Sequence, residues 1–146
     1  MEIKKKNMLG KAISITAQAF SGKIDKGGQP YILHCLRVMN AMPKNDSELR
    51  CAAVMHDLIE DTKWTISQLV ELGFSDRVIK AVVAMTHLDE SYEDYITDIS
   101  LNPDATLIKL ADLRDNSDIT RLKGLTKKDF KRMEKYHKAF TYLSKT

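Results

Sequence analysis

The sequence has few residues that break helices or cross-link small domains: 146 residues include six glycines, three prolines and two cysteines. Cys35 and Cys51 are too few and wrongly spaced for a disulfide framework or a Cys-rich zinc site. We expect both to be small buried apolar side chains, in keeping with a reducing cytoplasm. Because no repeat and no Pro/Gly/Ser-rich linker divides the sequence, we expect one domain.

Long apolar runs and a strong excess of one charge are also missing. No stretch approaches the roughly 18 apolar residues that would span a bilayer, so we expect no membrane association and a cytoplasmic location. The formal charge of +3, from 23 basic and 20 acidic residues, gives no argument for specific nucleic-acid binding. The sequence leaves the oligomeric state open.

Apolar periodicity and capping residues predict an all-α bundle of about seven or eight helices. Between residues 8 and 20 the apolar positions 9, 12, 13, 16, 17 and 20 form one helical stripe. A loop over 22–28 and a helix from Pro30 to about Met42 should follow. The next helices should begin at caps in 45–47 and at Thr65, Ser75, Asn102 and Thr126.

The helix predicted from 45–47 to about residue 61 or 62 contains an unusual polar group. His56, Asp57, Glu60 and Asp61 interrupt an otherwise apolar segment. Burying carboxylates beside an imidazole is costly unless a cation or a hydrogen-bond network compensates them. Residues four apart share a helix face, so we expect His56 over Glu60 and Asp57 over Asp61. These side chains should line a pocket.

Two further polar residues, His34 and Asp112, lie in apolar stretches of other predicted helices. Alone, His34 would more often be a core histidine, and Asp112 could pair with Lys109 or Arg114. Together with His56 and Asp57 they form a mixed nitrogen and oxygen donor set that suits Mn²⁺, Fe²⁺ or Zn²⁺ better than Mg²⁺. The sequence therefore predicts a metal site.

Three motifs in order resemble a known family: Tyr31-Ile32-x-His34, His56-Asp57-x-x-Glu60-Asp61-Thr62 and Lys109-Leu110-Ala111-Asp112-x-x-x-Asn116. The residue types in these motifs and the spacing between the motifs are similar to those of the HD-domain hydrolases of the RelA/SpoT type, particularly the small single-domain alarmone hydrolases. The resemblance covers nearly the whole chain, from the Gly22 loop to Arg132-x-x-x-Tyr136-x-x-Ala139.

This resemblance implies one HD-type, metal-dependent hydrolase domain over residues 1–146. It implies one Mn²⁺, with other divalent transition metals left open, held by His34, His56, Asp57 and Asp112. Glu60 and Asp61 would serve the hydrolytic water as the catalytic acid pair, although both could simply end their helix. The implied reaction removes the 3′-pyrophosphate of the small nucleotide ppGpp or pppGpp and releases GDP or GTP with pyrophosphate.

Five residues are candidates for binding this substrate. Asn116 would contact the nucleotide sugar, as in the family, or would cap its helix, and Tyr31 would line the pocket or belong to the core. The lysines would meet phosphates or remain solvated charges. The full set is Lys23, Lys26, Tyr31, Lys109 and Asn116.

The main departures from the family lie in the substrate loop. Family members often have His-x-Gly-Gln where this chain has Phe20-Ser21-Gly22-Lys23, and Cys35 replaces the usual Pro after the metal-binding His. Asp25 stands where the long alarmone enzymes place an Arg on the guanine, and an acid cannot supply that cation–π contact. Alternatives therefore stay open: another nucleotide monoester, the 2′-phosphate of NADPH, or a non-catalytic helical module that binds a nucleotide or a partner protein.

Overall fold

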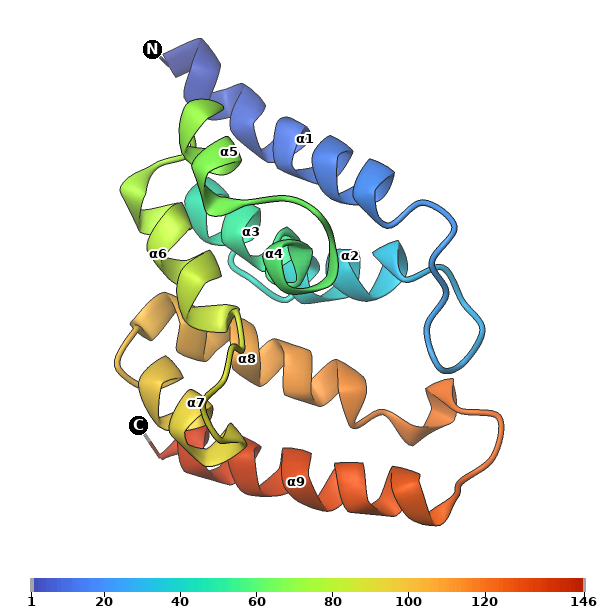
Figure 1. The fold of residues 1–146 in the computed structure, drawn as a ribbon. Coiled ribbons are helices and arrows are strands. Elements are labelled where there is room, and N and C mark those ends of the chain that lie inside the picture. The colour runs from blue at the N-terminus through green and yellow to red at the C-terminus, as the bar shows by residue number, and fades with distance from the viewer. Residues whose placement is uncertain (1, 146) are drawn as a thin grey trace.

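The computed structural model describes residues 2–145 and confirms the all-α prediction (Figure 1). Within this range it contains nine α-helices, of which one is a single turn, and one isolated β-bridge between Ile24 and Pro30. The helices are α1 (Glu2–Ala19), α2 (Ile32–Asn40), α3 (Ser47–Val54), α4 (Leu58–Asp61), α5 (Ile66–Glu71), α6 (Asp76–Met85), α7 (Tyr92–Ile99), α8 (Pro103–Asn116) and α9 (Lys127–Ser144), with the 3₁₀ helix η1 (Ile119–Arg121) between the last two.

The predicted caps are confirmed. Asp46, from the expected group 45–47, accepts a hydrogen bond from the backbone N–H of Leu49 at 3.0 Å. Thr65 with Gln68 and Thr126 with Asp129 form complete capping boxes, which satisfy the otherwise unpaired N–H groups of the first turn. Ser75 and Asn102 cap α6 and α8 through their side chains alone, which accept from the backbone N–H groups of Val78 and Ala105.

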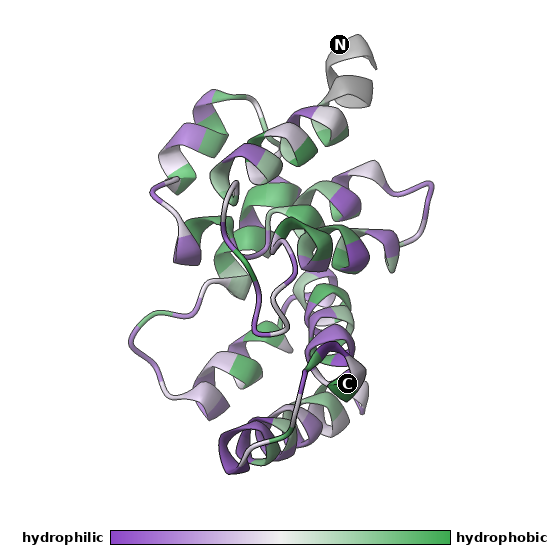
Figure 2. Ribbon diagram, turned by 90° about the vertical axis from the view of Figure 1, so that its right-hand side faces the viewer, coloured by the Kyte–Doolittle hydropathy of each residue, from purple (hydrophilic) through white to green (hydrophobic). Residues whose placement is uncertain are grey.

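Helices α3 and α8 lie at the centre of the bundle; α8 carries Lys109, Asp112 and Asn116, and the turn that follows α3 carries His56 and Asp57. Helix α3 packs against α1, α2 and α6, while α8 contacts α2, α6, α7 and α9. Figure 2 shows apolar residues concentrated on the central helices and polar residues on the outer helices and loops. Met55, Leu58, Ile108 and Leu113 are among the fully buried side chains. Polar groups on these helices are therefore held in a rigid, largely apolar interior.

The prediction of one continuous helix from 45–47 to residue 61 or 62 is wrong. Helix α3 ends at Val54 and α4 begins at Leu58, with His56 and Asp57 in the intervening turn. The ring Nδ1–H of His56 donates to the carbonyl oxygen of Ala53 at 2.7 Å. In a continuing helix that carbonyl would accept from the backbone N–H of Asp57. The side-chain bond therefore accompanies the end of the helix and redirects His56 and Asp57.

Other element boundaries differ by smaller amounts. The second helix begins at Ile32 rather than at Pro30, because Pro30 pairs with Ile24 in the bridge that closes the preceding loop. The first helix extends back to Glu2, and α7, capped by Ser91, was not expected. Among the described residues, none of these helices combines the length and apolar character required for a membrane crossing.

Candidate metal centre

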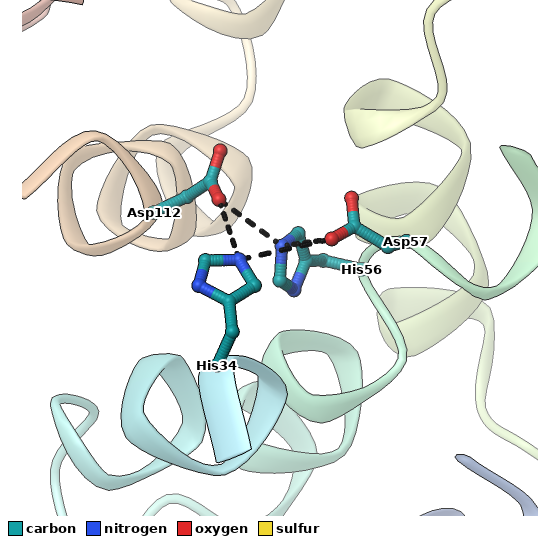
Figure 3. Close-up of side chains that lie close together, drawn as sticks. All are labelled: His34, His56, Asp57 and Asp112. Atoms are coloured by element: carbon teal, nitrogen blue, oxygen red, sulfur yellow. Dashed lines mark ion pairs between the residues drawn. The ribbon is translucent and has the colours of Figure 1, made fainter. Parts of the chain in front are cut away.

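Four side chains from three parts of the fold converge in the interior (Figure 3). His34 comes from α2, Asp112 from α8, and His56 and Asp57 from the turn between α3 and α4. His34 Nε2 lies 3.0 Å from Asp112 Oδ1, and His56 Nε2 lies 3.0 Å from Asp57 Oδ2 and 3.3 Å from Asp112 Oδ1. One ligand atom from each residue lies within 4.8 Å of all the others. The structure thus brings together the four residues that the sequence singled out as metal ligands.

The outer nitrogen of each imidazole is held by an acceptor, which assigns the tautomer. Nδ1–H of His34 donates to Asp115 Oδ2 at 2.6 Å, and Nδ1–H of His56 donates to the Ala53 carbonyl. Both Nε2 atoms therefore present a lone pair to the two carboxylates. These Nε2 atoms are buried and have no hydrogen-bond partner among the described residues. Since buried polar atoms normally have a partner, this donor set fits a divalent cation.

The charges of the cluster call for a cation as well. Burial by itself would raise the pKa of Asp112, but Lys109 and the two histidines lower it well below its usual range. Burial would lower the pKa of His56, whereas Asp57 and Asp112 raise it well above its usual range. The two carboxylates therefore stay ionised and attract positive charge. A bound divalent ion can supply that charge in place of ring protons.

Glu60 and Asp61 follow the cluster residues in α4 and lie exposed beside the cluster, without joining it. Glu60 Oε1 accepts a hydrogen bond from the backbone N–H of His87 at 2.6 Å, and Asp61 Oδ2 lies 3.8 Å from Lys23 Nζ. Partial burial raises the pKa of both carboxyl groups, and the negative charge of Asp57 adds to that effect. Two carboxyl groups with raised pKa values near a cation site are suited to accepting and returning a proton.

Three of the five predicted substrate-binding residues contact the metal-site carboxylates directly. The Tyr31 hydroxyl donates to Asp57 Oδ2 at 2.5 Å. Lys109 Nζ donates to Asp112 Oδ2 at 2.9 Å, and Asn116 Nδ2 donates to Asp112 Oδ1 at 3.1 Å. Lys109 is only 8% exposed, so it is not a solvated charge. These three groups orient the carboxylates.

A cavity of about 340 Å³ adjoins the cluster through Tyr31 and Asn116. Lys23 and Lys26 also line it, so four of the five substrate-binding candidates meet there, and Lys109 does not. Lys23 Nζ lies 4.4 Å from the centre of the Tyr31 ring. A larger groove of about 690 Å³ separates α7 from α9, but no residue of the metal cluster lines it. The further basic and aromatic residues of the smaller cavity are Arg121, Arg132 and Tyr136.

Two features of the site escaped the sequence reasoning. Asp115 holds the outer nitrogen of His34, and its only sequence signal was its place three residues after Asp112, on a neighbouring part of the same helix face. The Asp25 side chain is 6% exposed and both of its oxygens have partners: Oδ1 accepts from the backbone N–H groups of Gly27 and Gln29, and Oδ2 accepts from Arg121 at 2.9 Å. Asp25 therefore holds the loop in shape, and both of its oxygens are already engaged by the protein rather than available to a nucleotide base.

Comparison with known proteins identifies the fold. The family described as HD domain matches residues 12–105, which include His34, His56 and Asp57. The chain belongs to the HD domain family. A metazoan ortholog of SpoT that hydrolyses ppGpp is a structural neighbour of this HD domain, with a TM-score of 0.78, 22% sequence identity, and coverage of 93% of this chain and 84% of that one. At that identity the likeness establishes the fold.

Sequence relatives of this HD domain are much longer proteins. A guanosine-3′,5′-bis(diphosphate) 3′-pyrophosphohydrolase from Aquifex aeolicus is 34% identical over 102 residues, 62% of this chain and 14% of the relative. The bifunctional (p)ppGpp synthase/hydrolase SpoT of Escherichia coli is 31% identical over 122 residues, 74% of this chain and 17% of SpoT. A probable GTP pyrophosphokinase from Mycobacterium leprae is 30% identical over 122 residues, 75% of this chain and 15% of the relative. The chain thus spans less than a fifth of the length of each.

Proposed function

We propose that this HD domain is a metal-dependent (p)ppGpp 3′-pyrophosphohydrolase, with Mn²⁺ held by His34, His56, Asp57 and Asp112. The observation that carries the proposal is the pair of buried Nε2 atoms that face two ionised carboxylates and find no hydrogen-bond partner among the described residues. The names of the A. aeolicus and E. coli relatives support the choice of substrate.

A divalent metal at this position supplies a Lewis acid for a phosphoryl oxygen and makes a water more acidic. Glu60 and Asp61 accept the proton of the attacking water and orient it. The water oxygen becomes attached to the phosphorus next to the 3′ oxygen of the ribose, and the bond between that phosphorus and the 3′ oxygen breaks. The 3′ oxygen takes up a proton, so that GDP and pyrophosphate leave from ppGpp.

The remaining candidates take supporting roles in this proposal. Tyr31 and Lys109 fix Asp57 and Asp112 through the contacts described above, which keeps both carboxylates ionised and correctly turned. Lys23 and Lys26 place positive charge on the cavity wall, where phosphate groups of the nucleotide would bind. Asn116 reaches both Asp112 and the cavity, so it can hold the carboxylate and contact the sugar.

We also infer that residues 1–146 act as one HD-type domain in the cytoplasm. Cys35 and Cys51 are both free and buried, as expected of thiols in a reducing compartment. The helices of the described range share one hydrophobic core.

The test is a product assay with variants of the ligands. Chain stripped of metal and reloaded with Mn²⁺ is incubated with ppGpp, and GDP and pyrophosphate are resolved. Asp57→Ala and Asp112→Ala should each lose bound Mn²⁺ and turnover together, because a carboxylate of the donor set is gone. Full activity in either variant would contradict the proposal. Bound metal and nucleotide without any turnover in the unaltered chain would favour a non-catalytic binding module instead.

One observation favours a second candidate, hydrolysis of another nucleotide monoester or of the 2′-phosphate of NADPH. Asp25 replaces the guanine-stacking Arg and is itself occupied by Arg121, so this loop position offers no cation to a purine. The relative rates with ppGpp, NADPH and simple nucleoside phosphates distinguish the two. Exclusive hydrolysis of ppGpp would eliminate the second candidate, and preference for another phosphate ester would replace the first.

A further inference from the structure

Asp115 is the point at which the metal cluster meets a network of charged groups outside it. Its Oδ2 accepts from Nδ1–H of His34 at 2.6 Å and lies 2.9 Å from Arg121 Nη1. Its Oδ1 accepts from Nε of Arg37 at 2.7 Å. The side chains of His34 and Asp115 are 1% and 13% exposed, so the bond between them is little screened by solvent. Asp115 therefore holds the His34 ring in position and is itself held from two sides.

Arg121 extends this network to the loop that lines the cavity. Nη1 of Arg121 donates to the backbone carbonyl of Asp115 at 2.8 Å, and Nη2 donates to Asp25 Oδ2 at 2.9 Å. The other oxygen of Asp25 accepts from the backbone N–H groups of Gly27 and Gln29, both at 2.9 Å. A single guanidinium thus joins residues that are 90 positions apart in the chain, Asp25 and Asp115.

The backbone of the loop lies directly against the segment that carries Arg121. A Cβ atom at Gly27 would overlap the backbone carbonyl oxygen of Arg121, so only glycine fits there. Figure 1 shows the loop after α1 and the segment between α8 and α9 side by side. The loop that supplies Lys23 and Lys26 to the cavity is therefore docked through Arg121 rather than free in solvent.

We propose that Asp115 and Arg121 are positioning residues that link the metal centre to the nucleotide-binding loop, through the continuous path His34, Asp115, Arg121 and Asp25. This inference rests on the proposed function, since it takes His34 as a metal ligand. The Asp115 carboxylate binds Nδ1 of His34 and so turns Nε2 toward the metal, and the Arg121 guanidinium binds both that residue and the loop residue Asp25. Loading of the metal therefore orders the loop, and an undocked loop weakens the metal site, because linkage between two sites is reciprocal.

The first experiment measures Mn²⁺ affinity by calorimetry, independently of catalysis. Asp115→Asn should bind Mn²⁺ about 10–100-fold more weakly, as expected for an outer partner of a metal-binding histidine. Asp25→Asn keeps an oxygen for the Gly27 and Gln29 amides but loses the ionic bond to Arg121. It should weaken Mn²⁺ binding about two- to thirty-fold, the range for residues along a coupling network, although Asp25 touches no ligand. Arg114 is an exposed arginine of α8 that packs on the Phe140 ring and takes no part in this network. Arg114→Gln is therefore the matched control and should leave the Mn²⁺ affinity unchanged.

The second experiment measures the effect of metal binding on the loop, by amide hydrogen exchange. In the unaltered chain, Mn²⁺ should slow exchange of the Gly27 and Gln29 amides, which Asp25 holds. Arg121→Gln should abolish that metal-dependent protection while far-ultraviolet circular dichroism shows an intact helical fold. Metal-dependent protection that persists in Arg121→Gln, or equal Mn²⁺ affinity in Asp115→Asn and the unaltered chain, would overturn the link.

The two readouts separate this inference from the proposed function. Suppose that the unaltered chain binds Mn²⁺, that the variants lose Mn²⁺ affinity as predicted, and that ppGpp is nevertheless not hydrolysed. The link then stands and the proposed hydrolase activity is wrong. If ppGpp is hydrolysed but Asp115→Asn and Asp25→Asn bind Mn²⁺ like the unaltered chain, the activity stands and the link is wrong. A chain that binds no divalent metal would overturn both.

Discussion

Replacing Lys109 with methionine should destabilise the chain strongly. Lys109 is 8% exposed, and its Nζ lies 2.9 Å from Asp112 Oδ2 and 5.2 Å from the centre of the Tyr95 ring. Removing one partner of a buried ion pair costs about 3–5 kcal/mol, because the remaining charge stays buried without compensation. The two histidines and Asn116 still contact Asp112, so we expect a loss near the lower figure, about 3 kcal/mol.

The assay is urea unfolding followed by circular dichroism at neutral pH, with a chelator present so that no metal replaces the lost charge. A loss of this size corresponds to a fall of about 6–12 °C in the melting temperature for a chain near this length. Lys80→Met is the matched control, since Lys80 pairs with Asp76 at the surface with side chains 70% and 82% exposed. It should change the free energy of unfolding by less than about 1 kcal/mol. Equal free energies of unfolding for Lys109→Met and Lys80→Met would refute the reasoning that the buried charge of Asp112 is compensated by Lys109.

Three further predictions concern the acid pair, the surface and the core. The double variant Glu60→Gln, Asp61→Asn should bind Mn²⁺ normally and lose about 10²–10⁴-fold in turnover of ppGpp, as expected for lost proton transfer; unchanged turnover would exclude the pair from catalysis. Arg77 lowers the pKa of Asp46. The ion pair therefore stabilises the chain at pH values above the ordinary pKa of Asp, and this stabilisation is lost as the pH falls through the lowered pKa. Arg77→Met should therefore cost about 1 kcal/mol in urea unfolding at pH 6 and progressively less as the pH falls through the lowered pKa of Asp46, and the opposite order would contradict the assignment. Leu58→Ala should cost about 2–5 kcal/mol in the same assay, because Leu58 is fully buried, and a loss below 1 kcal/mol would show that the turn between α3 and α4 can collapse.

Much of the fold follows from local sequence signals. The capping residues Asp46, Thr65 and Thr126 each have a side-chain oxygen at the position where a helix needs an acceptor, and the structure uses all three. The four residues of the cluster could be picked out because isolated polar groups in apolar stretches need compensation, and because their motifs resembled one family. Both signals depend on residues close together in the chain, which a sequence shows directly.

The break at His56 could not be foreseen from periodicity. The apolar pattern on both sides of His56 is helical, and a competing side-chain bond to the Ala53 carbonyl leaves no trace in that pattern. Helix α7 was missed for a related reason, since it has only eight residues and its cap, Ser91, lies among other polar residues.

The network outside the cluster depends on contacts between distant parts of the chain. From the sequence, Asp25 indicated only the loss of an Arg that would stack on guanine. Its bond to Arg121, 96 residues further along the chain, shows that it organises the loop. Such partners are set by helix packing, which the spacing of residues within one segment does not reveal.

The most direct test of the central claim is an isotope-labelled product analysis. The Mn²⁺-loaded chain is incubated with ppGpp in ¹⁸O-labelled water, and the products are resolved by mass spectrometry beside a metal-free sample. The account predicts equal amounts of GDP and pyrophosphate, with the label in pyrophosphate, and no products without the metal. Intact ppGpp in the presence of one equivalent of bound Mn²⁺, or release of orthophosphate in place of pyrophosphate, would contradict it.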